Sequence, residues 1–413
     1  MSEISIAIPY FDHREAEEVA KVIASGWVAQ GSKVAEFERL VATYENVAHG
    51  IATTSCTTAL HLALIAMGLG ERHDCIVPSF TFTATSNSVI YTGATPVFAD
   101  VCEDTYNLDP VFLEHLIQEQ YDDRLINKKT GNQLKIIIAV SLFGLCADMP
   151  RINAIAKKYG LRVLQDSACA FGAKIGETME AAFGNMTCLS FHPRKSITTG
   201  EGGMVLTNDK VAASRMRTLR SHGASISELD RHKNAGYLMP DFNELGYNYR
   251  MTDIQAAIGV VQMQKMDFIT KTRIEKATMY NELVKNIGID FLKPPHVPSK
   301  YLHTYQSYVC VMDISKFGLK SNSIEDIEKA SILRNEIMRK LDSTGIATRV
   351  GTHANHLLGH YISRYGCKPQ MFKTSHMLDK LSIALPLHVQ LTELDQVKVM
   401  QSLVKAKNEL VGG

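Results

Sequence analysis

Short apolar runs alternate with helical patterns between about residue 50 and residue 215. Five of these runs are rich in apolar and β-branched residues: 75–78, 134–140, 161–165, 186–191 and 204–207. Such runs are typical of strands that are buried on both faces. Residues 59–67 instead have the apolar spacing of a helix, with Gly68 as a stop signal. Strands that alternate with helices predict an α/β fold with a mostly parallel sheet.

The rest of the chain predicts a second, smaller unit. Residues 324–343 and 392–410 have helical spacing in this unit, whereas residues 12–23 and 34–44 predict early helices of the larger one. Residues 252–284 predict one long linking helix, and residues 308–312 predict a strand. Because 413 residues exceed one ordinary core, we expect two domains, a large one at 1–255 and a C-terminal one at 256–413.

Two polar segments interrupt these patterns. Residues 119–133 are rich in turn-forming side chains and predict a surface excursion before the strand at 134–140. Residues 226–241 combine many polar residues with Gly and Pro and predict a mobile loop.

Composition narrows the classes of partner. A net charge of +1 gives no basic field for nucleic acid, and no apolar run is long enough to span a membrane. The N-terminus lacks the basic start and apolar region of a secretory signal. The eight cysteines include no Cys-x-x-Cys pair, so we expect reduced thiols in the cytoplasm and no metal site.

Lys195 is the first candidate for chemistry. It lies in a polar turn between two predicted strands, followed by Gly200, Gly202 and Gly203 around Glu201. A lysine that is fixed on such a turn and partly desolvated can lose its proton and act as an amine nucleophile or base. A lysine in a polar loop usually has no such role, so its neighbours must decide.

Asp166 directly follows the predicted strand at 161–165. Open α/β sheets bind ligands at the carboxyl ends of their strands. An acid there can hold a pyridine nitrogen protonated, or it can simply cap a helix.

Two upstream segments have the composition of a cofactor site. Residues 53–58 place hydroxyls before a helix, which suits either phosphate binding or plain helix capping. Phe80 and Phe82 follow a predicted strand and can stack on a flat ring or belong to the core.

Taken together and in this order, the motifs resemble the DegT/StrS family of sugar aminotransferases, which are fold-type I pyridoxal phosphate (PLP) enzymes. The resemblance covers nearly the whole chain and is carried by these segments: 24–31, 77–82, 91–100, 142–144, 147–149, 166–172, 190–203, 246–257 and 385–388. It implies an aspartate aminotransferase-like fold. Such a fold has a mostly parallel seven-stranded sheet in the large domain and a smaller C-terminal α+β domain.

The resemblance also implies residue roles. Lys195 would bind PLP covalently and move the proton during amino transfer, and Asp166 would pair with the ring nitrogen. Phe82 would stack on the ring, with Phe80 as second choice. The other implied cofactor-binding residues are Ser55, Cys56, Thr57, Cys169, Ser190 and Asn248. Asn248 would reach the phosphate of a neighbouring subunit, which implies a homodimer with shared active sites. Cys169 replaces the frequent Gln or His and marks a subgroup.

The implied substrates are L-glutamate and a nucleotide-diphospho keto sugar. The resemblance suggests these substrate-binding residues: Trp27, His192, Glu201, Arg220, Arg349, His353 and His356, with His222 as a weaker candidate. A purely structural role would explain His192 equally well.

The exact reaction stays open at this point. The 199–203 motif and His192 resemble members that aminate carbon 4 of a 4-keto-6-deoxyhexose, as perosamine synthases do for surface polysaccharides. Alternatives are a 3-keto sugar, an aminocyclitol ketone, or a PLP-binding regulator without turnover. Lys195 argues against the dehydrating branch, which has His there. A dinucleotide-binding dehydrogenase is disfavoured because no Gly-x-Gly-x-x-Gly follows a strand.

Overall fold

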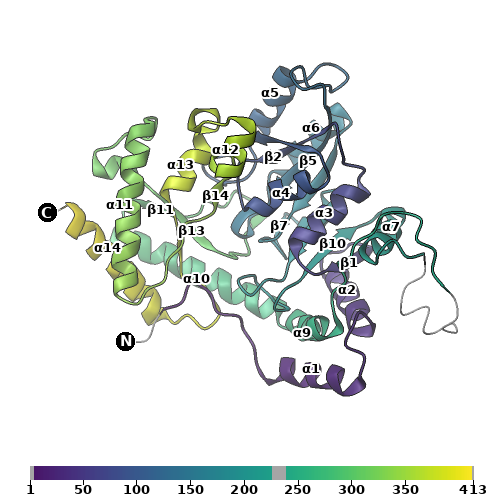
Figure 1. Ribbon diagram of the computed structural model, residues 1–413. Helices are drawn as coiled ribbons and strands as arrows, with labels where there is room; N and C mark the ends of the chain where they lie inside the picture. The colour runs from purple at the N-terminus through teal and green to yellow at the C-terminus, as the bar shows by residue number, and fades with distance from the viewer. Residues whose placement is uncertain (1–3, 226–238, 412–413) are drawn as a thin grey trace.

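The central sheet dominates the computed structural model, which describes residues 4–225 and 239–411 (Figure 1). Within those residues it has seven strands, in the order β1 (His49–Thr53), β10 (Gly203–Thr207), β9 (Met186–Ser190), β6 (Arg162–Asp166), β5 (Gln133–Val140), β2 (His73–Pro78) and β4 (Thr95–Ala99). β10 runs antiparallel to both of its neighbours, whereas β9, β6, β5, β2 and β4 are parallel. The mostly parallel α/β sheet is therefore confirmed.

Helices cover both faces of this sheet. One face packs against α3 (Cys56–Ala66), α4 (Thr83–Tyr91) and α7 (Lys210–Arg220). The other packs against α2 (Ser32–Tyr44), α5 (Pro110–Gln120), α6 (Met149–Tyr159) and α9 (Asp253–Gln264). In β5, Ile136 and Ile138 belong to the first core, and Ile137 and Ala139 to the opposite one. Burial on both faces explains the continuous apolar run at this strand.

A smaller unit follows, built on an antiparallel sheet of β11 (Leu292–Lys293), β13 (Tyr308–Met312) and β15 (Ser382–Leu385). Its helices are α10 (Met266–Ile287), α11 (Ile324–Ser343), α12 (Gly359–Tyr365), α13 (Lys373–Leu381) and α14 (Glu393–Val411). Ile4 bridges to Ile346, and the backbone N–H of Leu387 donates to Ile6. The first described residues thus pair with the C-terminal part, and the boundary at residue 255 stays a prediction.

Two minor sheets join distant segments. They are β12 (Tyr301–Leu302) with β7 (Lys174–Ile175) and β8 (Thr178–Met179), and β14 (His353–Ala354) with β3 (Phe80–Thr81). In the described part of the chain, no helix is long and apolar enough to cross a membrane.

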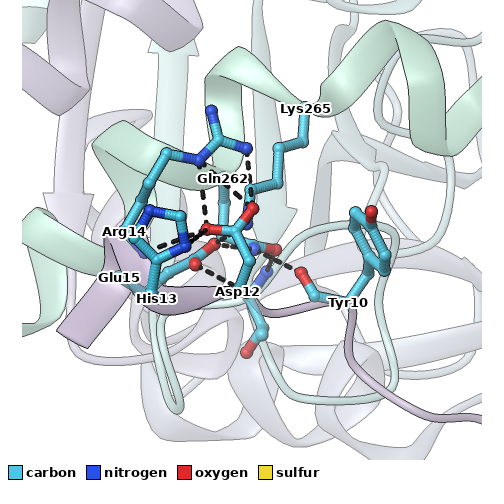
Figure 2. Close-up of polar contacts among 8 residues, drawn as sticks. Tyr10, Asp12, His13, Arg14, Glu15, Gln262 and Lys265 are labelled. Atoms are coloured by element: carbon cyan, nitrogen blue, oxygen red, sulfur yellow. Dashed lines mark hydrogen bonds and ion pairs between the residues drawn. The ribbon is translucent and has the colours of Figure 1, made fainter.

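The prediction of a single helix at 252–284 is wrong, because α9 and α10 are separate helices that meet at Lys265. The Lys265 side chain is 3% exposed and pairs with Glu15 at 2.5 Å and with Asp12 at 3.0 Å, both at the start of α1 (His13–Ser25) (Figure 2). Gln262 also donates to Glu15, at 2.6 Å. A buried ammonium requires such partners, so the break in the helix and the anchoring of α1 coincide.

The segment at 119–133 is more than a surface excursion. Tyr121 and Asn127 are buried, and both donate to the carboxylate of Asp74 on β2, at 2.9 and 2.8 Å. Asn132 adds a third bond, at 2.9 Å. These three hydrogen bonds to the buried Asp74 carboxyl group therefore fix the segment against the sheet. Most of the loop predicted at 226–241 lies outside the described residues.

Candidate active site

Asp166 ends β6 in the middle of the sheet, between β5 and β9. Its Oδ2 accepts a hydrogen bond from the Thr85 hydroxyl at 2.7 Å, and its Oδ1 accepts one from the backbone N–H of Ala168 at 3.2 Å. Burial raises the pKa of Asp166 above its usual range, although these hydrogen bonds and the nearby Lys195 charge oppose the shift. A buried carboxylate of this kind is stabilised by a cationic partner such as a protonated ring nitrogen.

Sequence reasoning missed Thr85, which holds this carboxylate from the first turns of α4. The available signal was its place in the hydroxyl-rich run that follows Phe82. The alternative of Asp166 as a helix cap does not apply, because its Oδ1 closes a local turn rather than starting a helix.

Lys195 lies on the loop between β9 and β10. Its backbone N–H donates to His192 at 2.8 Å, and Thr199 closes the loop by donating to Phe191 at 3.0 Å. The Lys195 amine donates to the Cys169 sulfur at 3.1 Å, which places the two predicted cofactor residues in contact.

The charge state of Lys195 differs from the sequence-based expectation. Burial lowers the pKa of the amine, but the contact with Cys169 and the nearby Cys56 and Asp166 outweigh it, so the pKa lies above its usual value. The amine is therefore protonated at neutral pH in this arrangement and must release a proton before it can act as a nucleophile.

The start of α3 forms a cradle beside this loop. The Ser55 hydroxyl accepts from the backbone N–H of Thr58 at 3.2 Å, so Ser55 is a helix cap. The first N–H groups of a helix have no acceptor within the helix, and those of Cys56 and Thr57 suit an anion. A Cβ on Gly203 would overlap the Ser55 carbonyl and the Cys56 nitrogen. Gly203 pairs with Ser190, so the two predicted phosphate-binding segments, residues 55–57 and Ser190, both lie beside Gly203.

Phe82 and Phe80 differ clearly in their exposure. The Phe82 side chain is 58% exposed at the start of α4, where its ring is free to stack on a ligand. Phe80 is fully buried and packs edge-on against Phe143, so it is a core residue and not the alternative stacking residue. β3 pairs with β14, which brings the exposed His353 next to Thr81, although the two lie far apart in the sequence.

His192 and Glu201 face each other across the Lys195 loop, with Nε2 and Oε1 3.9 Å apart. Burial lowers the pKa of His192, and Arg194 and Lys195 lower it further, whereas the facing Glu201 carboxylate partly opposes the shift. Gln255, in the first turn of α9, donates to the Glu201 carbonyl at 2.8 Å.

Two predicted substrate residues are structural instead. Arg220 is 3% exposed and binds Glu38 at 2.5 Å and the Ala52 carbonyl at 2.7 Å, so its charge is already used inside the protein. His356 is fully buried and shares a 2.5 Å hydrogen bond with Ser79. Burial and the neighbouring His376 lower the pKa of His356 to about 4.

The remaining candidates lie near the surface. Arg349 and Asn248 are exposed, and the Trp27 side chain is half-buried, with its indole N–H donating to the Gln30 carbonyl at 3.2 Å. The backbone of His222 is tied to Tyr247, but nothing here directs it to a substrate. Within the described ranges, no cluster of His, Cys, Asp and Glu could hold a metal ion.

These residues fit PLP in their chemistry. A buried carboxylate suits the ring nitrogen, and an amine 3.1 Å from the Cys169 sulfur suits the aldehyde. The first N–H groups of α3, which the Ser55 side chain does not bind, suit the phosphate. The exposed Phe82 ring suits the face of the cofactor.

Comparisons with known proteins agree with this assignment. The model of the DegT/DnrJ/EryC1/StrS aminotransferase family matches residues 9–404. The GDP-perosamine synthase of Caulobacter vibrioides is 34% identical over 404 residues, 98% of each chain. The spore coat polysaccharide biosynthesis protein SpsC of Bacillus subtilis is 32% identical over 408 residues, 98% of this chain and 97% of the relative.

Solved structures agree as well. Helicobacter pylori PseC, an aminotransferase involved in the biosynthesis of pseudoaminic acid, has a TM-score of 0.85 and is 26% identical, covering 99% of this chain and 100% of its own. A DegT DnrJ EryC1 StrS aminotransferase from Brucella abortus has a TM-score of 0.81 and is 31% identical, covering 97% and 96%.

The fold, the site and these similarities define a PLP-dependent sugar aminotransferase with an aspartate aminotransferase-like fold. The chain belongs to the DegT/DnrJ/EryC1/StrS aminotransferase family. Its cofactor is pyridoxal phosphate.

Proposed function

We propose that the protein transfers the amino group of L-glutamate to carbon 4 of a nucleotide-linked 4-keto-6-deoxyhexose. The resulting amino sugar would enter a surface polysaccharide or glycoconjugate. The observation that carries the reaction type is the convergence of Lys195, Cys169 and the buried Asp166. The similarity to a GDP-perosamine synthase across 98% of both chains supports the choice of acceptor.

Each predicted residue would have a separate role in the reaction. Bound PLP supplies the electron sink for amino transfer. Asp166, held by Thr85, would keep the ring nitrogen protonated, and the Lys195 amine would accept and return the proton at the substrate carbon. The start of α3, with Ser55, would hold the phosphate, and Phe82 would cover the ring.

The acceptor would bind where several segments meet around the Lys195 loop. His192 and Glu201 lie on that loop, and Gln255 ties it to α9. Exposed Arg349 and His353 supply basic groups, which suits a diphosphate. Arg220 and His356 have no part in this proposal, because both are buried in structural contacts.

We also infer a homodimer in which Asn248 completes the neighbouring site. Asn248 is exposed on a segment that pairs with Ser221 at the end of α7. All eight cysteines are free, which supports a reducing compartment such as the cytoplasm.

The test is the visible spectrum of the purified protein with L-glutamate alone, followed by GDP- and dTDP-linked 4-keto-6-deoxyhexoses. We expect a lysine-bound PLP band that glutamate bleaches and that a keto sugar restores, with the 4-amino sugar as product. Lys195→Ala should lack the band and turnover, whereas Lys210→Ala, at an exposed lysine on α7, should behave as wild type.

Three outcomes would contradict parts of the proposal. A band that ignores glutamate would indicate another donor or a regulator without turnover. Amination of only 3-keto sugars or aminocyclitol ketones would overturn the acceptor. An active Lys195→Ala protein would overturn the site itself.

A further inference from the structure

The N-terminus of α2 is capped by a side chain from a different helix. Gly31 occupies the N-cap position of α2 and has no side chain with which to cap it. Asp253, the first residue of α9, supplies the cap. Its Oδ1 accepts from the backbone N–H groups of Gly31 at 2.8 Å and Val34 at 3.0 Å. Its Oδ2 accepts from the backbone N–H of Lys33 at 3.2 Å. A carboxylate is favourable at a helix N-terminus, and this one is 2% exposed.

The same carboxylate fixes the turn before α2, which contains Trp27. The backbone N–H of Asp253 donates to the Ala29 carbonyl at 3.0 Å, so the turn is bonded from both sides. A Cβ on Gly31 would overlap both the Trp27 indole and the Asp253 carboxylate. The indole therefore lies directly against the Asp253–Gly31 contact.

The first turn of α9 also holds the loop that carries the catalytic lysine. Gln255, two residues after Asp253, donates to the Glu201 carbonyl at 2.8 Å, and Glu201 faces His192. One helical turn thus joins the Trp27 turn to the Lys195 loop.

The far end of α9 prevents this helix from adjusting freely. Gln262 and Lys265 bind Glu15 and Asp12 at the start of α1, as Figure 2 shows. In Figure 1, α1, α2 and α9 lie together at one side of the sheet. Because both ends of α9 are fixed, its first turn is a rigid reference for the two segments that it joins.

We propose that Asp253 is a positioning residue for the sugar acceptor: its carboxylate holds the Trp27 turn against the loop of Glu201 and Lys195. This inference rests on the proposed function, in which His192 and Glu201 lie at the acceptor site, and on the sequence-based prediction that Trp27 binds the acceptor as well. It assigns Asp253 no contact with substrate or cofactor. Loss of the carboxylate should impair acceptor binding while the reaction with glutamate continues.

The variants Asp253→Asn and Asp253→Ala test this on the PLP-loaded protein. Asparagine keeps one acceptor oxygen, whereas alanine keeps none, so the effects should be graded. With a GDP-linked 4-keto-6-deoxyhexose as acceptor, we expect KM to rise about 10-fold in Asp253→Ala and less in Asp253→Asn. The rate of bleaching by L-glutamate should stay within about twofold of wild type.

Trp27 provides an independent readout, because it is the only tryptophan of the chain. Acrylamide should quench its fluorescence more strongly in both variants if the turn is released. This measurement needs no acceptor. If the protein aminates no nucleotide sugar, the proposed function is wrong, but the quenching still shows whether Asp253 holds the Trp27 turn.

Asp267→Asn is the matched control. Asp267 accepts a hydrogen bond from Tyr44 at 3.0 Å, at the other end of α2, and lies away from the Trp27 turn. It should leave the acceptor KM and the Trp27 quenching unchanged. The proposal is overturned if Asp267→Asn raises the acceptor KM equally, if the Asp253 variants slow both half-reactions alike, or if Trp27 quenching does not change.

Discussion

Burial disfavours the ionised form of Asp166, and the hydrogen bond from the Thr85 hydroxyl favours it. Burial raises the pKa of this carboxyl, and the 2.7 Å hydrogen bond from Thr85 lowers it. The balance matters because only an ionised Asp166 can hold a protonated ring nitrogen. If Asp166 serves the ring nitrogen as proposed, the Thr85 hydroxyl supports that role without contact to the substrate.

Thr85→Val should test this balance with almost no change in shape. Removal of the hydroxyl should raise the pKa of Asp166 further, so kcat/KM should fall about 10- to 100-fold, the range for a hydrogen bond to a charged group. The loss should grow as the pH is lowered, because protonation of Asp166 increases as the pH falls. Thr85→Ser keeps the hydroxyl and should stay near wild type; equal losses in both variants would contradict the role of the hydroxyl.

Glu45 is a second buried acid, and it makes stability depend on pH. It accepts the backbone N–H groups of Gly172 at 2.8 Å and Ala181 at 3.2 Å. Burial raises its pKa from 4.5 to about 7, opposed by these two bonds and by Lys174 and reinforced by Glu180. The folded protein then holds a proton that the unfolded chain releases, so this contribution is present below pH 4.5 and is lost as the pH rises to about 7.

Glu45→Gln should remove this dependence. We expect the free energy of unfolding of the wild type to lose about 3 kcal/mol between pH 4.5 and 7 from this group alone, by the linkage relation. Urea denaturation at pH 5, 6, 7 and 8 would measure the slope in both proteins. Parallel curves for the wild type and Glu45→Gln would contradict the raised pKa.

At the scale of elements, the pattern of apolar residues predicted the strands that are buried on both faces of the sheet. β5, β6 and β9 lie inside the sheet and are mostly buried, and their apolar residues form runs from which these strands were predicted. β1 and β4 lie at its edges and contain a glycine and a proline, respectively, and neither strand was predicted.

Other features depend on contacts that no local pattern encodes. Apolar spacing continues across Lys265, because α9 and α10 both bury apolar side chains, so the break could not be seen. Arg220 and His356 matched the type of a substrate residue, but Glu38 and Ser79, far away in the sequence, already bind them. The Lys195 and Asp166 segments were found because their place at strand ends follows from the order of elements.

β10 and the start of α3 approach each other closely at Gly203, and Gly203→Ala tests this contact. An added Cβ would overlap backbone atoms of Ser55 and Cys56, which cannot rotate away. The start of α3 should shift, and the Kd for PLP should rise at least about 10-fold, the loss expected when anion-binding groups are displaced by about an ångström. Titration of the PLP-free protein with PLP measures this.

Gly70→Ala is the control for this substitution. Its added Cβ would meet only the Thr92 carbonyl, at 3.8 Å, which is an ordinary contact. It should bind PLP as the wild type does. A Gly203→Ala protein with unchanged affinity would show that the start of α3 does not hold the phosphate.

For the whole molecule, the surface around Asn248 is aromatic, and its rings contact one another. Tyr247 and Tyr249 stack with ring centroids 5.0 Å apart, and the Tyr249 hydroxyl lies 2.9 Å from His61 Nδ1. Tyr91, 57% exposed, packs edge-on against the same histidine. An exposed asparagine between two stacked tyrosines has a defined position before any partner binds, which suits a role in a neighbouring site.

Mixing two inactive variants tests whether Asn248 acts across the proposed dimer. Lys195→Ala and Asn248→Ala should each be impaired alone. After unfolding and refolding together at equal amounts, about half of the dimers should be mixed, and each mixed dimer should contain one intact site, so activity should return to about a quarter of wild type. Lys195→Ala mixed with Asp166→Ala should recover nothing, since both residues serve the same subunit's site and every site in that mixture lacks one of them. If the Asn248→Ala mixture recovers nothing either, Asn248 serves the site of its own chain, and the shared site must be abandoned even if the protein is dimeric.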